Sequence, residues 1–284
     1  IEENSKIKID IDKIDFDDVK TYDMISAGDT LAVFQFESDG MQEYLKRLKP
    51  SNLEELTAMN ALYRPGPMDN IPDFIERKNG RQNIEYLHPL MEKVLKTTYG
   101  IIVYQEQVMQ LVQVIADFSL GQADILRRAM GKKQIAYMDK MKPLFVQGAS
   151  QHNIDEKLAL EIFDLIYKFA DYGFNKSHSL AYSYLAFQTA WLKAHYPTEF
   201  LASVMTSLLN DQNQIVALID EAKKFNIKVV PPDINKSTAN FFGSGKTIFF
   251  GMAGIKNVGV AAVNKIVEAR SNKPFTSIFD FIER

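Results

Sequence analysis

The 284-residue sequence contains no cysteine, which excludes disulfide bonds, thiolate zinc sites and cysteine nucleophiles. Histidine is scarce, and its four copies form no H-E-x-x-H pair, so a zinc peptidase has little support. We also find no apolar stretch long enough to cross a bilayer and no signal peptide at the start. These absences favour a soluble globular protein of a reducing compartment, and we expect the cytoplasm. Because the first residue is Ile1 rather than methionine, we expect a piece of a longer chain.

Charge is nearly balanced overall, at a formal −3, but it is unevenly distributed along the chain. Residues 1–20 carry seven acidic side chains against four lysines. Residues 121–142 reverse this, with six basic side chains against Asp124 and Asp139. The net charge gives no general attraction to nucleic acid, so a local basic site on a mildly acidic body is the feature to explain.

From about Thr21 to Phe225 the apolar residues recur at helical intervals. Ser51 and Glu54 have the spacing of a capping box, which predicts a helix start there. That helix must end before the R-P-G-P run at residues 64–67, because prolines and glycine cannot continue it.

Four further helices are predicted from the same periodicity. One stripe runs from Tyr104 to Ile115, a second follows Asp155 as its N-cap, and a third begins at Ile215. Residues 180–196 are apolar nearly all round, which predicts a central buried helix.

After Asn226 the pattern changes to that of a small α/β segment. Residues 227–230 are typical of a strand, and the aromatic pairs around 243–246 predict a β-hairpin. We therefore expect a mainly α protein, a helical body with a small C-terminal α/β appendage. The expected divisions are residues 1–20 as a connection, 21–225 as the helical body and 226–284 as the small segment.

Three patterns resemble functional sites but favour plainer interpretations. The G-S-G-K-T run at 243–247 resembles the end of a Walker loop, yet it lacks the first glycine and precedes a strand pattern. The aspartates at positions 10, 12, 15 and 17 could pair on a strand face to hold metals, but an acidic solvated segment is favoured. His195, near the end of the 180–196 helix, is interpreted as a structural histidine.

The first segment that carries chemistry is L-G-Q-A-D-I-L-R-R-A-M-G-K-K at 120–133. It predicts a short helix with Gly131 at its C′ position, which gathers Arg127, Arg128, Lys132 and Lys133 within two turns. Arginine grips phosphate oxygens in pairs and lysine supplies a mobile charge. A solvated basic face is the alternative, but mixing with core residues favours an anion site.

The second segment is Y-G-F-N-K-S-H-S at 172–179, just before the buried helix. A helix start offers free N–H donors and a partial positive charge, to which Lys176 and His178 would add. One of the two aromatic residues that flank Gly173 offers a surface for a base or a sugar. An N-capped helix entry with buried aromatics is the alternative. Two such segments in one body indicate a nucleoside triphosphate site.

A third segment, Gly254 to Arg270, has the pattern of a helix-hairpin-helix, which binds DNA backbone without reading sequence. The hairpin normally has glycine on both sides of a small apolar residue, and here Asn257 replaces the first glycine before Val258 and Gly259. Asparagine tolerates left-handed backbone, so the turn can persist. Lys256, Asn257, Val258 and Gly259 are the candidate DNA contacts, against a merely structural helix turn.

Long stretches of the sequence resemble the alpha subunit of bacterial DNA polymerase III, in its DnaE rather than its PolC class. The matching stretches are collinear from about Thr21 onward. They are F-Q-F-E-S-D-G-M (34–41), A-L-Y-R-P-G-P-M (61–68), T-Y-G-I-I-V-Y-Q-E-Q-V-M (98–109), L-R-R-A-M-G-K-K (126–133), Y-G-F-N-K-S-H-S (172–179) and W-L-K-A-H-Y-P-T-E-F (191–200).

The resemblance implies the fingers region of a DNA polymerase, followed by its helix-hairpin-helix. In that family, three palm aspartates bind two Mg²⁺ ions, and they would lie before this chain, so the 284 residues alone are expected to be inactive. The primer 3′-hydroxyl attacks the α-phosphate of a deoxynucleotide and releases pyrophosphate. The residues assigned to nucleotide binding are Arg127, Arg128, Lys132, Lys176 and His178 for the phosphates, Tyr172 for sugar or base, and Arg64 for phosphate or template.

The resemblance further implies template-primer DNA as a partner, and the sliding clamp and replisome as partners of the full-length protein. Two other functions stay open. One is a non-catalytic module that binds DNA backbone through the helix-hairpin-helix alone. The other, more distant, is a Walker-type NTPase, which would require a helix after residues 240–247.

Overall fold

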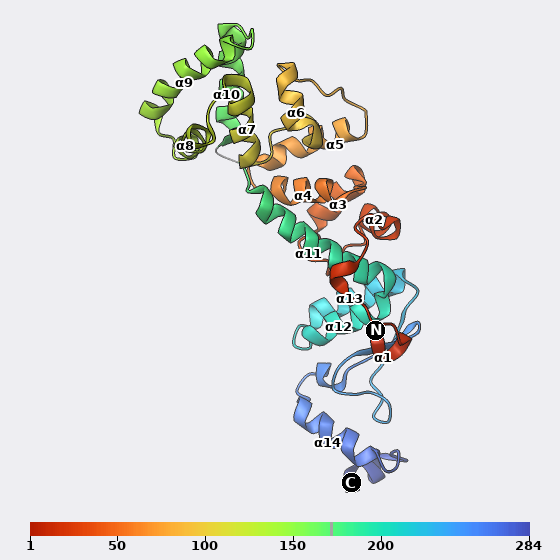
Figure 1. Ribbon diagram of the computed structural model, residues 1–284. Helices are drawn as coiled ribbons and strands as arrows, with labels where there is room; N and C mark the ends of the chain where they lie inside the picture. The colour runs from red at the N-terminus through yellow and green to blue at the C-terminus, as the bar shows by residue number, and fades with distance from the viewer. Residues whose placement is uncertain (171–172) are drawn as a thin grey trace. The chain divides into compact units, whose positions relative to one another are not determined.

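The computed structural model describes residues 1–170 and 173–284, and helices dominate it (Figure 1). The expected mainly α fold with a small sheet is confirmed. The described chain forms two compact units. Unit 1 comprises residues 1–24, 30–37 and 188–284, and unit 2 comprises residues 25–29 and 38–187. The divisions at residues 20 and 225, which rest on sequence pattern, stay a prediction.

Unit 2 is built from helices and short 3₁₀ turns. In chain order they are α3 (Asp39–Leu48), α4 (Leu53–Leu62), η2 (Pro67–Asn70), α5 (Ile71–Lys78), η3 (Pro89–Met91), α6 (Glu92–Leu95), η4 (Lys96–Thr98), α7 (Gln105–Ala116), α8 (Leu120–Gly131), α9 (Ile135–Ser150), α10 (Glu156–Ala170) and the first part of α11 (Lys176–His195).

The main core of unit 2 surrounds α7, which packs against α8, α9 and α10 (Figure 1). The predicted stripe of α7 is confirmed, since Val108, Leu111 and Ile115 are buried. Gly148 lets α9 approach closely, because a Cβ at this position would lie only 2.1 Å from the carbonyl oxygen of Ala116. This contact holds the C-terminal end of α7 against α9, and the candidate site is built around the opposite end of the helix, at Gln105.

The capping box predicted at Ser51 and Glu54 is wrong by one residue. Asn52 is the N-cap of α4 and accepts a hydrogen bond from the Glu55 N–H at 3.0 Å. Glu55 in turn accepts from the Ser51 N–H at 2.7 Å and is buried. Asparagine caps as well as serine does, so the spacing alone allowed both registers. The shift leaves the side chain of Glu54 available for another partner.

The expectation that residues 180–196 form a helix buried all round is also wrong for its first half. Leu180, Tyr182 and Leu185 are exposed by 37%, 38% and 44%. The buried face carries small polar residues instead: Ser179 donates to the Thr57 carbonyl oxygen at 2.6 Å, and Ser183 accepts from Asn60 at 2.7 Å. Because small side chains let α11 lie close to α4, the larger apolar residues point to the other face.

Unit 1 contains the remaining elements. They are α1 (Glu2–Ser5), η1 (Ile11–Lys13), most of α2 (Val19–Ser26), the end of α11, α12 (Pro197–Ser207), α13 (Gln212–Lys224), β1 (Lys228–Val230), β2 (Phe242–Ser244), β3 (Thr247–Phe249), η5 (Met252–Gly254), α14 (Val260–Arg270) and α15 (Ile278–Glu283). The strands form one sheet in the order β1-β3-β2, with β1 parallel and β2 antiparallel to β3.

The hairpin predicted around residues 243–246 is confirmed as β2 and β3, with Gly245 in the left-handed region at φ 57°. A strand follows the G-S-G-K run, so the helix that a Walker loop requires is replaced by β3. Phe242 and Phe249 are cross-strand partners whose rings stack 4.5 Å apart. This stacking explains why the aromatic pattern was a reliable strand signal.

Lys193 and Glu221 form a buried ion pair in unit 1. Lys193 Nζ lies 2.5 Å from a carboxylate oxygen of Glu221, and the two side chains are 0% and 2% exposed. Lys193 also donates to the Leu31 carbonyl oxygen at 2.8 Å, and Lys224 lies 2.8 Å from the other oxygen of Glu221. Burial alone would raise the pKa of Glu221, but the hydrogen bond and charge of Lys193, together with Lys224, lower it.

His195 has the geometry of a structural residue. Its Nε2 lies 3.0 Å from a carboxylate oxygen of Asp18, and its ring stacks on Trp191 at 4.6 Å. Burial raises the pKa of Asp18, yet hydrogen bonds from Thr21 and His195 outweigh it and lower the pKa. In the acidic N-terminal segment, Asp10 and Asp15 accept backbone hydrogen bonds two residues ahead and are exposed.

Candidate functional site

Arg127 and Arg128 project from α8 and share one carboxylate, that of Asp124. Arg127 Nη2 lies 2.9 Å from Oδ1 of Asp124, and Arg128 Nη2 lies 2.6 Å from Oδ2. The Arg127 hydrogen bond, supported by Arg128, lowers the pKa of Asp124. Arg127 is half-buried whereas Arg128 is 65% exposed, so the two guanidiniums have different environments.

The basic end of α8 differs in detail from its prediction. Gly131 is the last helical residue rather than a left-handed C′ residue, and Lys132 is the C-cap. Lys133 takes the left-handed conformation instead, at φ 51°. Lys132 is exposed. The helix therefore presents Lys132 to solvent next to the turn that leads into α9.

Gln105, the first residue of α7, joins α8 to the second basic segment. Its Oε1 accepts a hydrogen bond from Arg127 Nη1 at 3.0 Å, and its backbone N–H donates to the Phe174 carbonyl oxygen at 2.9 Å. Phe174 in turn donates to the Val103 carbonyl oxygen at 3.1 Å, which completes a short parallel bridge. The segments around 127 and 174 thus meet at the start of one helix.

The donors at the start of α11, predicted to be free, are partly occupied. Glu106, next to Gln105, accepts from the Lys176 backbone N–H at 3.0 Å and from the Asn175 amide at 3.1 Å. Asn175 caps the helix by accepting from the His178 N–H at 2.8 Å. A carboxylate on a neighbouring element thus satisfies a helix start that sequence alone left open. Recognition of an anion here would rest on side chains.

Lys176 extends its side chain toward Glu54 and Tyr104. Its Nζ donates to one Glu54 oxygen at 3.2 Å, lies 2.9 Å from the other, and sits 5.5 Å from the centre of the Tyr104 ring. The Tyr104 hydroxyl is buried and has no hydrogen-bond partner among the described residues. Burial, with the charges of Glu54 and Glu106, raises its pKa, so it remains a donor at neutral pH. Buried donors are seldom left unpaired, which makes this hydroxyl a feature to explain.

Arg64 and His178 meet at the ring of Phe174. The Arg64 guanidinium carbon lies 4.2 Å from the ring centre, and the His178 ring lies edge-on at 5.4 Å. Arg64 Nε also donates to the Ala61 carbonyl oxygen at 2.9 Å, and burial lowers its pKa. Arg64 therefore belongs to the same cluster as Lys176 and His178, although only the R-P-G-P run at 64–67 suggested it in the sequence.

These contacts define the α7-start cluster: Arg64, Gln105, Glu106, Arg127, Phe174, Lys176 and His178. Arg128 and Lys132 lie on the adjoining α8. Tyr172, the candidate for sugar or base contact, lies outside the described residues. Gln105, Glu106 and Phe174 were not predicted as site residues, although all three lie within the motifs quoted for the resemblance.

The helix-hairpin-helix segment has the expected backbone. Asn257 is left-handed at φ 68°, and Gly259 is the N-cap of α14. The turn borders a hollow of about 620 Å³. The residues that line the hollow are Leu209, Asn210, Gln212, Ala253, Gly254, Ile255, Lys256, Asn257, Val258 and Gly259.

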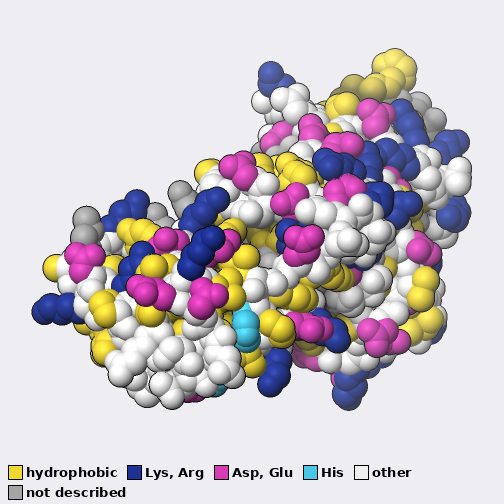
Figure 2. Space-filling view, turned by 90° about the horizontal axis from the view of Figure 1, so that it is seen from above, with side chains coloured by type: hydrophobic (Ala, Val, Ile, Leu, Met, Phe, Trp, Pro, Cys, Tyr) yellow, Lys and Arg dark blue, Asp and Glu magenta, His cyan; other side chains and the backbone are white. Residues whose placement is uncertain are grey.

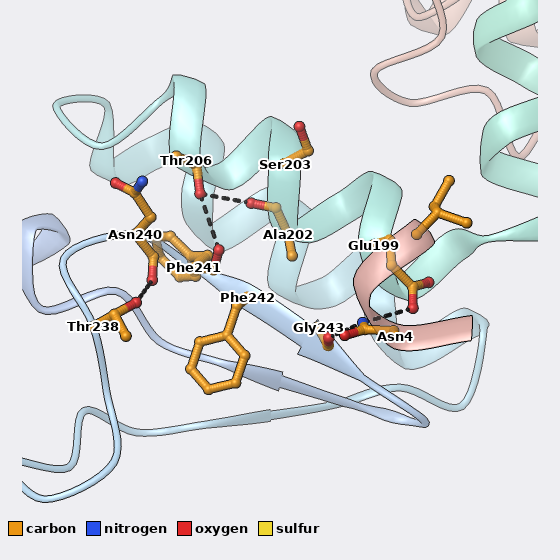
Figure 3. A pocket seen from close by; sticks show the side chains of 11 residues that line it. Asn4, Glu199, Ala202, Ser203, Thr206, Thr238, Asn240, Phe241, Phe242 and Gly243 are labelled. Atoms are coloured by element: carbon orange, nitrogen blue, oxygen red, sulfur yellow. Dashed lines mark hydrogen bonds between the residues drawn. The ribbon is translucent and has the colours of Figure 1, made fainter. Parts of the chain in front are cut away.

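A second hollow in unit 1, of about 530 Å³, lies between α12, β2 and residues 238–241 (Figure 3). Thr206 Oγ1 donates to the Phe241 carbonyl oxygen at 3.2 Å, and the Asn4 amide bonds both Glu199 and the Gly243 carbonyl oxygen (Figure 3). None of the residues that line it is among the predicted site residues, although Gly243 belongs to the Walker-like run at 243–247.

Basic and acidic side chains are interspersed over the face drawn in Figure 2. Among the described residues, exposed ion pairs three residues apart include Lys46 with Glu43 and Lys223 with Asp220. Within residues 1–170 and 173–284 there is no group of three or more His, Asp or Glu side chains that could hold a metal ion. No helix in the same residues is long and apolar enough to cross a membrane.

Comparison with known proteins gives two family matches. Residues 1–153 match the model of the bacterial DNA polymerase III alpha subunit finger domain, and residues 226–284 match that of the helix-hairpin-helix motif. Among similar curated proteins are three named DNA polymerase III subunit alpha. That of Caulobacter vibrioides is 48% identical over 98% of this chain and 24% of its own length. That of Bacillus subtilis is 47% identical over 100% of the chain and 26% of its own length.

The third, from Campylobacter jejuni, is 51% identical over 95% of the chain and 23% of its own length. The chain therefore spans about a quarter of the length of the relatives it matches. Because the finger-domain model covers more than half of the chain, the resemblance seen in the sequence is confirmed. This chain belongs to the bacterial DNA polymerase III alpha subunit finger-domain family.

Proposed function

We propose that the chain is the fingers region of a replicative DNA-directed DNA polymerase and that it binds the triphosphate of the incoming deoxynucleotide. The observation that carries this proposal is the α7-start cluster. There, the Arg127 guanidinium of α8 and the backbone N–H of Lys176 at the start of α11 donate hydrogen bonds to adjacent residues, Gln105 and Glu106. Two basic residues from distant parts of the sequence therefore meet at the start of α7, which is the arrangement that a single polyanionic ligand requires.

In this proposal the fingers supply positioning and charge neutralisation, the main sources of catalysis in phosphoryl transfer. Arg127, Arg128, Lys132, Lys176 and His178 bind the β- and γ-phosphates. Arg64 is a further candidate for phosphate or template, and Tyr172 for the sugar or base. Mg²⁺ would neutralise the phosphates from palm carboxylates outside these residues, so the 284 residues alone would not extend a primer.

The carboxylates beside these cations do not argue against phosphate binding. The ion pair between exposed Arg128 and Asp124 is weak, because water screens it. A charge-assisted hydrogen bond from arginine to phosphate is worth about 1.5–3 kcal/mol. A triphosphate can therefore replace Asp124 on the Arg128 guanidinium, while Asp124 keeps its hydrogen bonds to Arg127.

Arg128→Ala in the full-length polymerase tests this proposal. We expect kcat/KM for nucleotide incorporation to fall about tenfold, mainly through a higher KM, because one phosphate contact is lost. The measurement is single-nucleotide incorporation into a primed template at varied nucleotide concentration. Arg81→Ala is the matched control, since Arg81 is another exposed arginine paired with a carboxylate, that of Glu76. Equal kinetics for Arg128→Ala and the wild type would remove Arg128 from the site.

The proposal extends to the partners and the location of the full-length protein. Template-primer DNA would be its substrate, the sliding clamp and other replisome proteins its partners, and the cytoplasm its compartment. These assignments rest on membership of the family and on the names of the relatives, which cover the chain almost completely.

A second candidate function, contact with the DNA backbone by the helix-hairpin-helix, is favoured by its turn geometry. Left-handed Asn257 and the N-cap Gly259 aim the start of α14 at the same hollow that Lys256 lines. Backbone N–H groups in such a turn bind phosphates without regard to sequence. This contact can coexist with nucleotide binding, and alone it would make the chain a non-catalytic DNA-binding module.

Lys256→Ala should weaken DNA binding uniformly across sequences and reduce the slope of log Kd against log salt by about 0.9. The measurement is a salt titration of duplex binding by fluorescence anisotropy. Lys223→Ala, at an exposed lysine on α13, is the control and should leave the slope unchanged. An unchanged slope with Lys256→Ala would exclude the hairpin lysine as a phosphate contact.

A further inference from the structure

The Arg127 guanidinium is hydrogen-bonded to side chains of two different helices, Asp124 of α8 and Gln105 of α7. On one side, its Nε and Nη2 donate to Asp124 Oδ1 at 3.3 Å and 2.9 Å. On the other, Nη1 donates to Gln105 Oε1 at 3.0 Å. A guanidinium has five N–H donors, so these bonds leave two for a ligand.

Asp124 and Gln105 place the guanidinium relative to different parts of the protein. Asp124 lies on α8 itself, one turn before Arg127, so it fixes the guanidinium only with respect to its own helix. Gln105 lies on α7 and is bonded through its backbone N–H to the Phe174 carbonyl oxygen at 2.9 Å. It therefore relates the guanidinium to the segment that carries Lys176 and His178.

Gln105 itself has little freedom at this position. A Cβ added to Gly173 would lie 3.2 Å from the Gln105 Cγ and from its backbone nitrogen, so the 173–174 backbone lies directly against Gln105. The next residue, Glu106, accepts from the Lys176 N–H at 3.0 Å. In the first turn of α7, Gln105 therefore bonds Arg127, and the next residue, Glu106, bonds the start of α11.

We propose that Gln105 is a positioning residue that holds the Arg127 guanidinium in register with Lys176 and His178. This proposal rests on the proposed function, because it presumes that Arg127 binds phosphate. Gln105 acts through its amide oxygen, which accepts one Arg127 N–H and leaves the two remaining N–H groups for the triphosphate. Without that acceptor, Arg127 would keep its bond to Asp124 but lose its orientation toward the second basic segment.

The test compares Gln105→Ala, Gln105→Glu, Arg127→Ala and Gln105→Ala/Arg127→Ala in the full-length polymerase. We expect Gln105→Ala to raise the nucleotide KM about fivefold to tenfold while kcat changes less than about twofold. Gln105→Glu keeps an oxygen acceptor at the same place and should restore KM to within about twofold of the wild type. The double variant should be no worse than Arg127→Ala, because Gln105 has nothing left to position.

Gln110→Ala is the matched control, since Gln110 lies on the exposed side of the same helix. The thermal unfolding temperature of each variant shows whether a raised KM comes from a misplaced Arg127 guanidinium or from an unfolded protein. If Gln105→Ala does not fold, Gln105→Glu tests the positioning role in its place. A raised KM for Arg127→Ala with an unchanged KM for Gln105→Ala would overturn the positioning role alone. So would a full additional loss when Gln105→Ala is added to Arg127→Ala, or a failure of Gln105→Glu to restore KM. An unaffected Arg127→Ala would overturn the proposed function as well.

Discussion

Combining Arg127→Ala with Lys176→Ala in the full-length polymerase is expected to lower kcat/KM for nucleotide incorporation by at least about 100-fold. Each substitution removes a charge-assisted contact worth about 1.5–3 kcal/mol, and about 1.4 kcal/mol corresponds to a factor of ten. The loss should appear mainly as a raised KM, because the triphosphate is bound before the chemical step as well as during it.

Arg81→Ala combined with Lys142→Ala is the matched control for that variant. Both residues are cations of unit 2 that pair with exposed carboxylates, Glu76 and Asp164, away from the α7-start cluster. The control removes the same two charges, so it corrects for any general electrostatic effect on nucleotide approach. A comparable loss in the control would attribute the effect to net charge rather than to a site.

Lys193→Met is expected to lower the free energy of unfolding of unit 1 by about 3 kcal/mol. Removing one partner of a buried ion pair leaves the other charge uncompensated, which typically costs about 3–5 kcal/mol. We expect the lower end of this range because Lys224 still lies 2.8 Å from the second oxygen of Glu221. Urea unfolding followed by the fluorescence of Trp191, which lies in unit 1, measures the change.

The same variant should change the acid dependence of stability. Because the pKa of Glu221 is lowered in the folded protein, its stabilisation is complete above its unfolded pKa and is lost as pH falls through the folded pKa. In Lys193→Met that acid-sensitive contribution should shrink. Adding Glu221→Leu should recover most of the stability, since an apolar pair of similar volume is tolerated where a lone charge is not. An unchanged unfolding free energy for Lys193→Met would contradict the ion-pair argument.

Local patterns were sufficient for most of the fold. The apolar stripe of α7 could be predicted because Val108 and Leu111 are spaced to lie on one face of a helix, and that face is the buried one. The β2–β3 hairpin was predicted because aromatic residues pair across a glycine turn. Asn257 was expected to take left-handed backbone and does so. In each case the physical cause acts within a few residues along the chain.

The two wrong predictions, the N-cap of α4 and the full burial of α11, have different causes: two neighbouring residues could each cap the helix, and distant residues decide which face of α11 is buried. Ser51 and Asn52 are both good caps, and only burial of Glu55 decides that Asn52 begins α4. Leu180 and Leu185 are exposed because α11 uses its serines to approach α4, which no periodicity reveals.

The candidate site shows the same limit more sharply. Its cations could be predicted, because clusters of arginine and lysine are visible along the sequence. The hydrogen bond from Arg127 to Gln105 and that from the Lys176 N–H to Glu106 could not be predicted, because these partners are separated by 22 and 70 residues. Only the packing of α7 brings them together.

Inhibition by inorganic tripolyphosphate is the most direct test of the central claim, that both basic segments bind one polyanionic tail. At fixed free Mg²⁺, tripolyphosphate should compete with the nucleotide. Arg127→Ala and Lys176→Ala should each weaken its inhibition constant about tenfold, because it carries the phosphates without base or sugar. If either variant weakens nucleotide use but leaves the tripolyphosphate inhibition constant unchanged, the two segments do not share a phosphate site.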